Sequence, residues 1–166
     1  MNGAHWHLVV NHFPIIFPIV GVLVMLTGIV SKSEAIKRMA FIIFVFGALA
    51  AVAAITTGEG AEEVVENISG VADTDTYIKS HEETAETFAL LSYMLGSFSL
   101  VGLWASFKQR TFANIIAIAT LIFAIIVLFF AKETGTTGGE IRHTEIRSEN
   151  NKPATQDNRT EEGNGE

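Results

Sequence analysis

The chain has 166 residues, of which 49% are hydrophobic and only 17% charged, and its formal net charge is −7. Its length suits a single domain, and the acidic balance offers no basic surface of the kind that binds nucleic acid. No cysteine is present, which excludes disulfides, thiolate metal sites, iron–sulfur clusters and covalently attached c-type haem.

Four apolar stretches of 18–21 residues follow one another along the chain, and none contains a charged residue. A helix needs about 20 apolar residues to cross roughly 30 Å of bilayer hydrocarbon, whereas the helices of a soluble bundle carry polar stripes. The sequence therefore predicts an all-α integral membrane protein, an up-down four-helix bundle with antiparallel neighbours. The expected spans are about 13–30, 39–57, 87–107 and 112–131, within a domain of residues 1–146. The polar tail, 147–166, has little to bury and is expected to be disordered.

Three histidines stand at the entrance to the first span, in the stretch HWHLVVNHF over residues 5–13. His7 and His12 are five residues apart, which in a straight helix places them about 140° apart. They can contribute to one site only if this segment is bent or non-helical. Pro14 suits a first helical turn, and Pro18, one turn later, removes a backbone hydrogen bond and can bend the helix.

The second span is followed by EGAEEVVENI, and we expect the helix to continue through this stretch. Glu59, Glu62, Glu63 and Glu66 recur at helical spacing and form one acidic face. This face is either simply solvated or, through Glu59 or Glu62 nearest the membrane, able to orient a histidine or bind a cation.

The third span is preceded by the sequence SHEE, residues 80–83, which fits a capping box with Ser80 as N-cap and Glu83 at N3. This pattern predicts that the helix begins at His81. His81 then lies at the top of a stripe of small residues and should face the bundle interior. The alternative is an exposed histidine in the capping turn.

The fourth span is followed by ETGTTGGEIRH, which contains Gly135, Gly138 and Gly139. These glycines permit a turn that folds Glu140 and His143 back over the mouth of the bundle. Alternatively, they end the helix and begin a flexible tail, and the spacing does not decide between the two.

Basic residues set the expected orientation, because Lys and Arg accumulate in cytoplasmic loops. The first and third loops carry five of them, whereas the loop of residues 58–80 carries only Lys79 against six acidic residues. The five are Lys32, Lys37, Arg38, Lys108 and Arg110. Both termini are therefore predicted to be periplasmic, in a bacterial inner membrane. All five histidines fall at the periplasmic ends of the helices: His5, His7, His12, His81 and His143.

Four sequence features occur together at the ends of the spans. They are HLVVNHFPI at the first span, TTGEGAE after the second, a histidine opening the third and TGTTGGEIRH after the fourth. This combination, over about residues 5–146, resembles an uncharacterised bacterial membrane protein family, domain of unknown function 2231. The most specific parts are His7 and His12, and the run GGE that precedes His143. The resemblance implies a four-helix membrane fold and no established activity. Its histidine pattern is similar to that of membrane b-type cytochromes.

Haem binding is the first function that this pattern suggests. Bis-histidine ligation of haem b needs two imidazoles from different segments, aimed at the iron from opposite faces of the ring. The candidate ligands are His7, His12, His81 and His143. Such a protein would be a redox or electron-relay subunit that works with a membrane or periplasmic redox partner.

Two alternatives stay open. A non-haem Zn, Cu or Fe ion would take mixed imidazole and carboxylate ligands, for which the candidates are His12, His81, Glu59, Glu62 and Glu140. A structural or accessory subunit would bind no cofactor and would use its polar rim to contact another protein or a second copy. The sequence contains neither a nucleophile–base arrangement nor the HExxH motif of zinc proteases, so no catalytic pattern marks the chain as an enzyme.

Overall fold

A computed structural model describes residues 3–69, 74–109 and 111–147 of the chain, and this part consists of helices joined by short turns, without strands. The helices are α1 (Gly3–Val10), α2 (Phe13–Val30), α3 (Glu34–Ser69), α4 (Thr74–Phe107) and α5 (Ala113–Arg142), followed by the 3-10 helix η1 (Thr144–Ile146). The predicted tail, apart from Arg147, lies outside the described residues.

Four segments are long and apolar enough to cross a membrane, with α1 and α2 together forming the first. They are Gly3–Val30, Glu34–Ala61, Asp75–Phe107 and Ala113–Ile141. The predicted all-α four-helix membrane bundle is confirmed, and the chain is a multi-pass membrane protein in a lipid environment.

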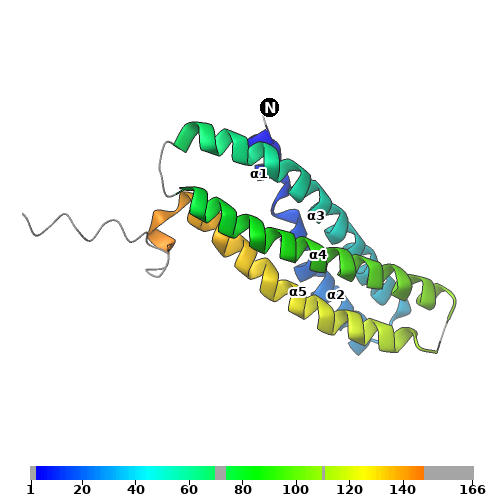
Figure 1. Cartoon of the computed structure of the whole chain (residues 1–166). Helices are drawn as coiled ribbons and strands as arrows, with labels where there is room; N and C mark the ends of the chain where they lie inside the picture. The colour runs from blue at the N-terminus through cyan, green and yellow to red at the C-terminus, as the bar shows by residue number, and fades with distance from the viewer. Residues whose placement is uncertain (1–2, 70–73, 110, 148–166) are drawn as a thin grey trace, which may run out of the picture.

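The four long helices pack side by side in chain order, and α5 also packs against α2, which closes the bundle (Figure 1). The short helix α1 lies against α3. We call the end that carries His7 and His81 the histidine end, and the opposite end, which carries Lys37, the lysine end.

Small residues allow the helices to approach closely, as expected in lipid, where van der Waals packing replaces the hydrophobic effect between helices. A side chain at Gly21 would collide with the ring of Phe44, and a Cβ at Gly96 would lie 2.6 Å from the Cβ of Ala48. The core is apolar along most of its length, with Met25, Ala40, Phe41, Phe44, Phe88, Leu95, Ala117, Ala124, Val127 and Ala131 at its centre. Large apolar side chains such as Ile115, 69% exposed, point outward to the lipid.

The helix limits at the histidine end differ from two predictions. α3 does continue through the acidic stretch to Ser69, as expected. However, α4 begins at Thr74, so Ser80 lies inside the helix, and the prediction of a capping box at residues 80–83 is wrong. No glycine or proline interrupts this stretch, and a helix already nucleated in the bundle extends cheaply by one hydrogen bond per residue.

The glycines after the fourth span neither form a turn nor end the helix, since α5 runs on to Arg142. Both predicted alternatives for this segment are therefore wrong. The reason is packing: Gly138 lies against the ring of His81, so the absent side chain is what allows α5 to continue alongside α4.

Candidate histidine site

His7 is fixed by the close packing of α1 against α3. A Cβ at Gly3 would lie 2.6 Å from the carbonyl oxygen of Gly60, so the two backbones touch at this point. One turn further along α1, the Nδ1 atom of His7 donates a hydrogen bond to the carbonyl oxygen of Ala54 at 3.1 Å, and lies 3.3 Å from the Thr57 hydroxyl. A carbonyl can only accept, so Nδ1 carries the proton and the lone pair is on Nε2.

His81 is held in a similar way between α4 and α5. Its Nδ1 lies 3.2 Å from the Thr137 hydroxyl oxygen, which is also 2.9 Å from the hydroxyl of Thr84 and 3.1 Å from the carbonyl of Thr134. The Thr84 hydroxyl also lies 2.9 Å from the carbonyl oxygen of His81, so its proton can go there or to Thr137. When Thr137 donates to the Thr134 carbonyl it accepts from His81, and in this assignment the His81 proton is on Nδ1 and the lone pair on Nε2.

The predicted inward orientation of His81 is confirmed. The ring lies directly against the backbone of α5, since a Cβ at Gly138 would be only 2.9 Å from the Cε1 atom of His81. Glycine is therefore required at this position for the ring to occupy its place.

The structure brings His7, His12 and His81 to the same end of the bundle, close enough for His12 to act electrostatically on His7 and for His7 to act on His81. The bend that the sequence required is present, because α1 ends at Val10 and α2 begins at Phe13. His12 lies in this bend as the N-cap residue of α2 and is exposed, and its carbonyl accepts from the backbone of the first turn.

Asn11, in the same bend, has a buried side-chain oxygen with no hydrogen-bond partner. Buried acceptors are almost always paired with protein or water. This oxygen is therefore an unsatisfied acceptor at the bend, and it is shielded from solvent as well.

His143 lies at the C-terminal end of α5, five residues beyond the Gly138 that packs on His81. It is the C-cap residue of α5, its side chain is 63% exposed, and its Nδ1 lies 2.9 Å from a carboxylate oxygen of Glu145. The backbone N–H of Glu145 and then the His143 imidazole lower the pKa of the Glu145 carboxyl below its usual value.

Arg147 closes the end of α5. Its guanidinium donates to the carbonyl oxygens of Glu140 at 2.9 Å and Ile141 at 3.3 Å, and it stacks 3.9 Å from the ring centre of Tyr77 in α4. A cation on the last carbonyls of a helix complements the helix dipole. Arg147 thereby ties the C-terminus of α5 to the start of α4.

The carboxylates proposed as metal ligands are distributed rather than clustered. Glu59 is exposed on α3, Glu140 is buried on α5 at 5% exposure, and Glu62 lies in α3 with its side chain outside the described part. Among the described residues, no group of three or more His, Asp or Glu side chains could hold a metal ion.

Sequence reasoning missed a polar cluster at the lysine end. Lys37, whose side chain is only 4% exposed, donates to the carboxylate of Glu34 and the amide oxygen of Asn114. Ser106 donates to Glu34 at 3.0 Å and accepts from Nε of Arg38 at 2.9 Å. The cluster joins α3, α4 and α5. The available signals were the i, i+3 spacing of Glu34 and Lys37 and the asparagine in the first turn of an apolar helix.

No protein-family model, curated protein or solved structure matches this chain. The functional interpretation therefore rests on the geometry of the histidine end.

Proposed function

We propose that this membrane protein binds haem b at its histidine end, with His7 and His81 as the two axial ligands. The observation that supports this most directly is that both imidazoles contact neighbouring helices through Nδ1, and with Nδ1 protonated each lone pair lies on Nε2. Histidines that ligate metals commonly donate their other ring N–H to a carbonyl or similar acceptor, which fixes the tautomer and increases the ligand's basicity. The two histidines come from different helices, as bis-histidine ligation requires.

The residues present suit haem better than a bare ion. Two imidazoles supply both protein ligands of a six-coordinate haem iron, whereas a non-haem site needs three or more donors, which the described residues do not gather. The His7 ring packs over Gly58 of α3, where a Cβ would lie 3.7 Å from its Cε1 atom.

Bound haem would supply one-electron transfer. The chain would hold its ligands in place through Ala54, Thr57 and Thr137, and its apolar surroundings would limit access of water. We further propose membership of the family it resembles, insertion in a bacterial inner membrane and periplasmic termini. The site would then exchange electrons with a redox protein on the periplasmic side. A C-terminal alkaline phosphatase fusion should be active, and an inactive fusion would contradict this orientation.

A structural role is the second candidate, and one observation favours it. His7 joins α1 to α3 and His81 joins α4 to α5, so both histidines already act as hydrogen-bonded clamps between helices. In this interpretation the histidine end would be a polar cap that a partner protein recognises.

Absorption spectra of the full chain, purified from membranes of a haem-supplied host, test the proposal. We expect a Soret band with about one haem per chain by the pyridine haemochrome assay. The decisive variants are His7→Asn and His81→Asn, because the asparagine amide nitrogen lies close to the position of Nδ1. Each keeps the hydrogen-bond donor but removes Nε2. Both variants should lose the Soret band while remaining folded by circular dichroism.

His143→Ala is the matched control, since this histidine is exposed and should leave the spectrum unchanged. Colourless wild-type protein after haem reconstitution would refute haem binding. If in addition the asparagine variants matched wild-type stability and the corresponding alanine variants lost about 1 kcal/mol each, the structural role would be supported. Stoichiometric metal without haem would favour the Zn, Cu or Fe alternative.

A further inference from the structure

The lysine end of the bundle carries an excess of positive charge, although the chain as a whole is acidic. The charged side chains described at this end are four cations and one carboxylate, whereas the entire chain has a formal net charge of −7. They are Lys32, Lys37, Arg38 and Lys108, with Glu34. A local excess of positive charge attracts anions, provided that at least one of the cations has donors to spare.

Arg38, on α3, has such donors. Its Nε atom donates to the hydroxyl oxygen of Ser106 and its Nη2 atom to the carbonyl oxygen of the same residue, both at 2.9 Å. A guanidinium has five N–H groups, so two on Nη1 and one on Nη2 have no hydrogen-bond partner among the described residues. These nitrogens are within reach of a ligand, because Arg38 is only partly buried and the sealed, unpartnered side-chain atoms of the described chain belong to other residues.

The guanidinium of Arg38 is also held in a fixed orientation. Besides its two bonds to Ser106, it stacks on the ring of Phe107, 4.4 Å from the ring centre. A fork that is already oriented loses little conformational entropy on binding, and its parallel N–H groups match two oxygens of one phosphate. Arg38 is therefore prepared to bind a phosphate group.

The two charged neighbours of Arg38 do not compete for these donors. Lys37 is buried and donates to Glu34 and Asn114, so it adds positive charge without contacting a ligand itself. The Glu34 carboxylate accepts from Lys37 and from Ser106. Its negative charge is thus offset by the ammonium that it contacts.

The depth of Arg38 indicates where the phosphate comes from. The second membrane-spanning segment begins at Glu34 and the third ends at Phe107, so Arg38 lies about 6 Å from the end of its segment. From this depth an arginine side chain extends to the headgroup level, where the phosphates of the bilayer lie.

Apolar side chains lead from Arg38 toward the middle of the bilayer on both neighbouring helices. On α3, Ile42 and Phe46 follow Arg38 at intervals of four residues, and on α4, Trp104 precedes Phe107 by about one turn. Each of these side chains is exposed on the lipid-facing surface, and α3 and α4 pack side by side. The acyl chains of a lipid held at Arg38 would lie along these rows, a contact that a soluble anion cannot make.

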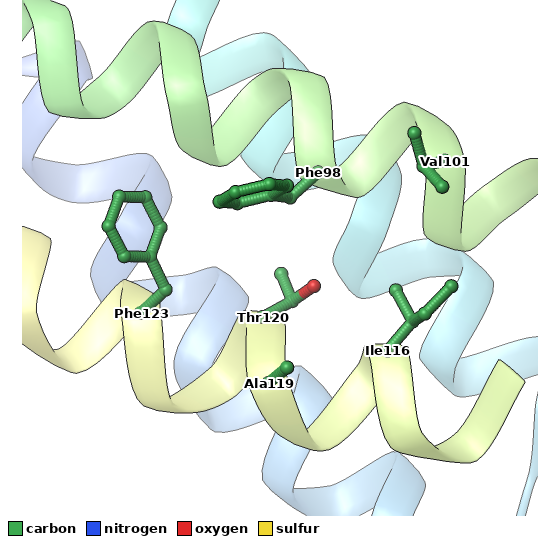
Figure 2. Close-up of a pocket in the computed structure, with 6 residues that line it drawn as sticks. All are labelled: Phe98, Val101, Ile116, Ala119, Thr120 and Phe123. Atoms are coloured by element: carbon green, nitrogen blue, oxygen red, sulfur yellow. The ribbon is translucent and has the colours of Figure 1, made fainter. Parts of the chain in front are cut away.

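The hollow between α4 and α5 lacks this combination (Figure 2). It has a volume of about 200 Å³ and is lined by Phe98, Val101, Ile116, Ala119, Thr120 and Phe123. Thr120 has the one polar side chain of this set, and its hydroxyl oxygen is shielded from the surroundings. The hollow therefore offers no donor to a lipid headgroup, in contrast to the surface around Arg38.

We propose that Arg38 binds the phosphate of an anionic phospholipid, with its free N–H groups donating to the phosphate oxygens. Lys108, exposed directly after Phe107, adds a second positive charge. The excess of positive charge favours a headgroup with a net negative charge, such as phosphatidylglycerol, over zwitterionic phosphatidylcholine. The proposal does not rest on the haem site, which lies at the opposite end of the bundle.

Quenching of tryptophan fluorescence by brominated lipids tests the proposal with the full chain in liposomes. The chain has two tryptophans, so Trp6→Phe leaves Trp104, close to Phe107. Brominated phosphatidylglycerol and brominated phosphatidylcholine are compared as quenchers in a background of unbrominated phosphatidylcholine. We expect the anionic lipid to bind beside Trp104 about fivefold more tightly than phosphatidylcholine, or more.

Three charge-removing variants locate the preference. Arg38→Gln should reduce it to near one, if the variant folds as judged by circular dichroism. Lys108→Gln, at an exposed position that does not endanger folding, should reduce it about twofold. Lys32→Gln is the matched control, because it removes the same charge from an exposed position in the turn between α2 and α3 and should leave the preference at Trp104 unchanged.

Three results would overturn the proposal. The first is equal quenching by the two lipids in the chain with Arg38 intact. The second is an equal loss of preference in Lys32→Gln and in the Arg38 or Lys108 variants, which would show diffuse attraction by the whole charged end. The third is displacement of brominated phosphatidylglycerol by millimolar inorganic phosphate but not by sodium chloride of the same ionic strength, which would assign Arg38 to a soluble anion.

Discussion

Replacing Gly138 by alanine tests whether the His81 ring lies flat against α5. The new Cβ would be 2.9 Å from Cε1 of His81 and 3.2 Å from its Nδ1, so the ring must move and its contact with Thr137 is lost. Overpacking costs about 1–3 kcal/mol and the lost hydrogen bond about 1 kcal/mol. The higher helix propensity of alanine than of glycine offsets about 1 kcal/mol of this loss of stability. We expect a net loss of about 2 kcal/mol.

Gly135→Ala is the matched control, three residues earlier in the same helix. A Cβ there would meet only Ile15, at an ordinary contact distance of 3.7 Å. This variant should therefore gain about 0.5–1 kcal/mol from helix propensity alone. The two substitutions are chemically identical, yet they should shift stability in opposite directions.

Equilibrium unfolding in mixed detergent micelles provides the measurement, followed by circular dichroism. The decisive background is His81→Ala, in which the obstructing ring is absent. In that background Gly138→Ala should change from destabilising to mildly stabilising, with a coupling energy of about 2–3 kcal/mol between the two positions. Flat packing of the His81 ring on α5 would be refuted if Gly138→Ala behaved like Gly135→Ala in the wild-type chain, or if its penalty persisted without the His81 ring.

Two further predictions concern the charged groups at the two ends of the bundle. Lys37→Ala should lower the free energy of unfolding by about 1–2 kcal/mol, because it removes the ammonium that Glu34 and Asn114 share, although the Glu34 carboxylate is half exposed, partly screened and still bonded to Ser106. Lys108→Ala, at an exposed position near the same end, should change stability by less than about 0.5 kcal/mol, and equal losses in both variants would contradict the role of the buried lysine. In His143→Ala, the pKa of the Glu145 carboxyl, followed by NMR titration, should rise only part of the way to its usual value, since its own backbone N–H is the larger cause of the depression. A full return to the usual value would show that the imidazole alone was responsible.

Hydrophobicity was sufficient to predict the four spans, because the bilayer thickness sets a minimum apolar length that the charge-free runs meet. The register of α4 was also readable, since one stripe of small residues places His81 toward the interior. The residues at which the helices end could not be predicted. The ends of α4 and α5 lie in polar sequence, where local signals such as a capping box or paired glycines compete with packing against a neighbouring helix, and packing prevailed.

The contacts of the candidate site were less predictable than the fold. The hydrogen-bond partner of His7 is the backbone carbonyl of Ala54. Every residue has a backbone carbonyl, so the residue types in the sequence could not identify this partner. The burial of Lys37 likewise depends on how α3 is rotated relative to α5, which brings Asn114 within reach. Helical periodicity gives the faces of each helix but not the relative rotation of two helices that are distant in sequence.

The short helix α1 has a consequence for how the histidine end can change. None of its eight residues is buried, and the contacts that hold it include the backbone contact of Gly3 with Gly60 and the His7 hydrogen bond. Few buried contacts imply a low free energy of local opening. We expect the amides of α1 to exchange with deuterium well before those of the core of α3. Detachment of eight residues would then expose His7 to water and dismantle the site, while the rest of the protein keeps its transmembrane fold.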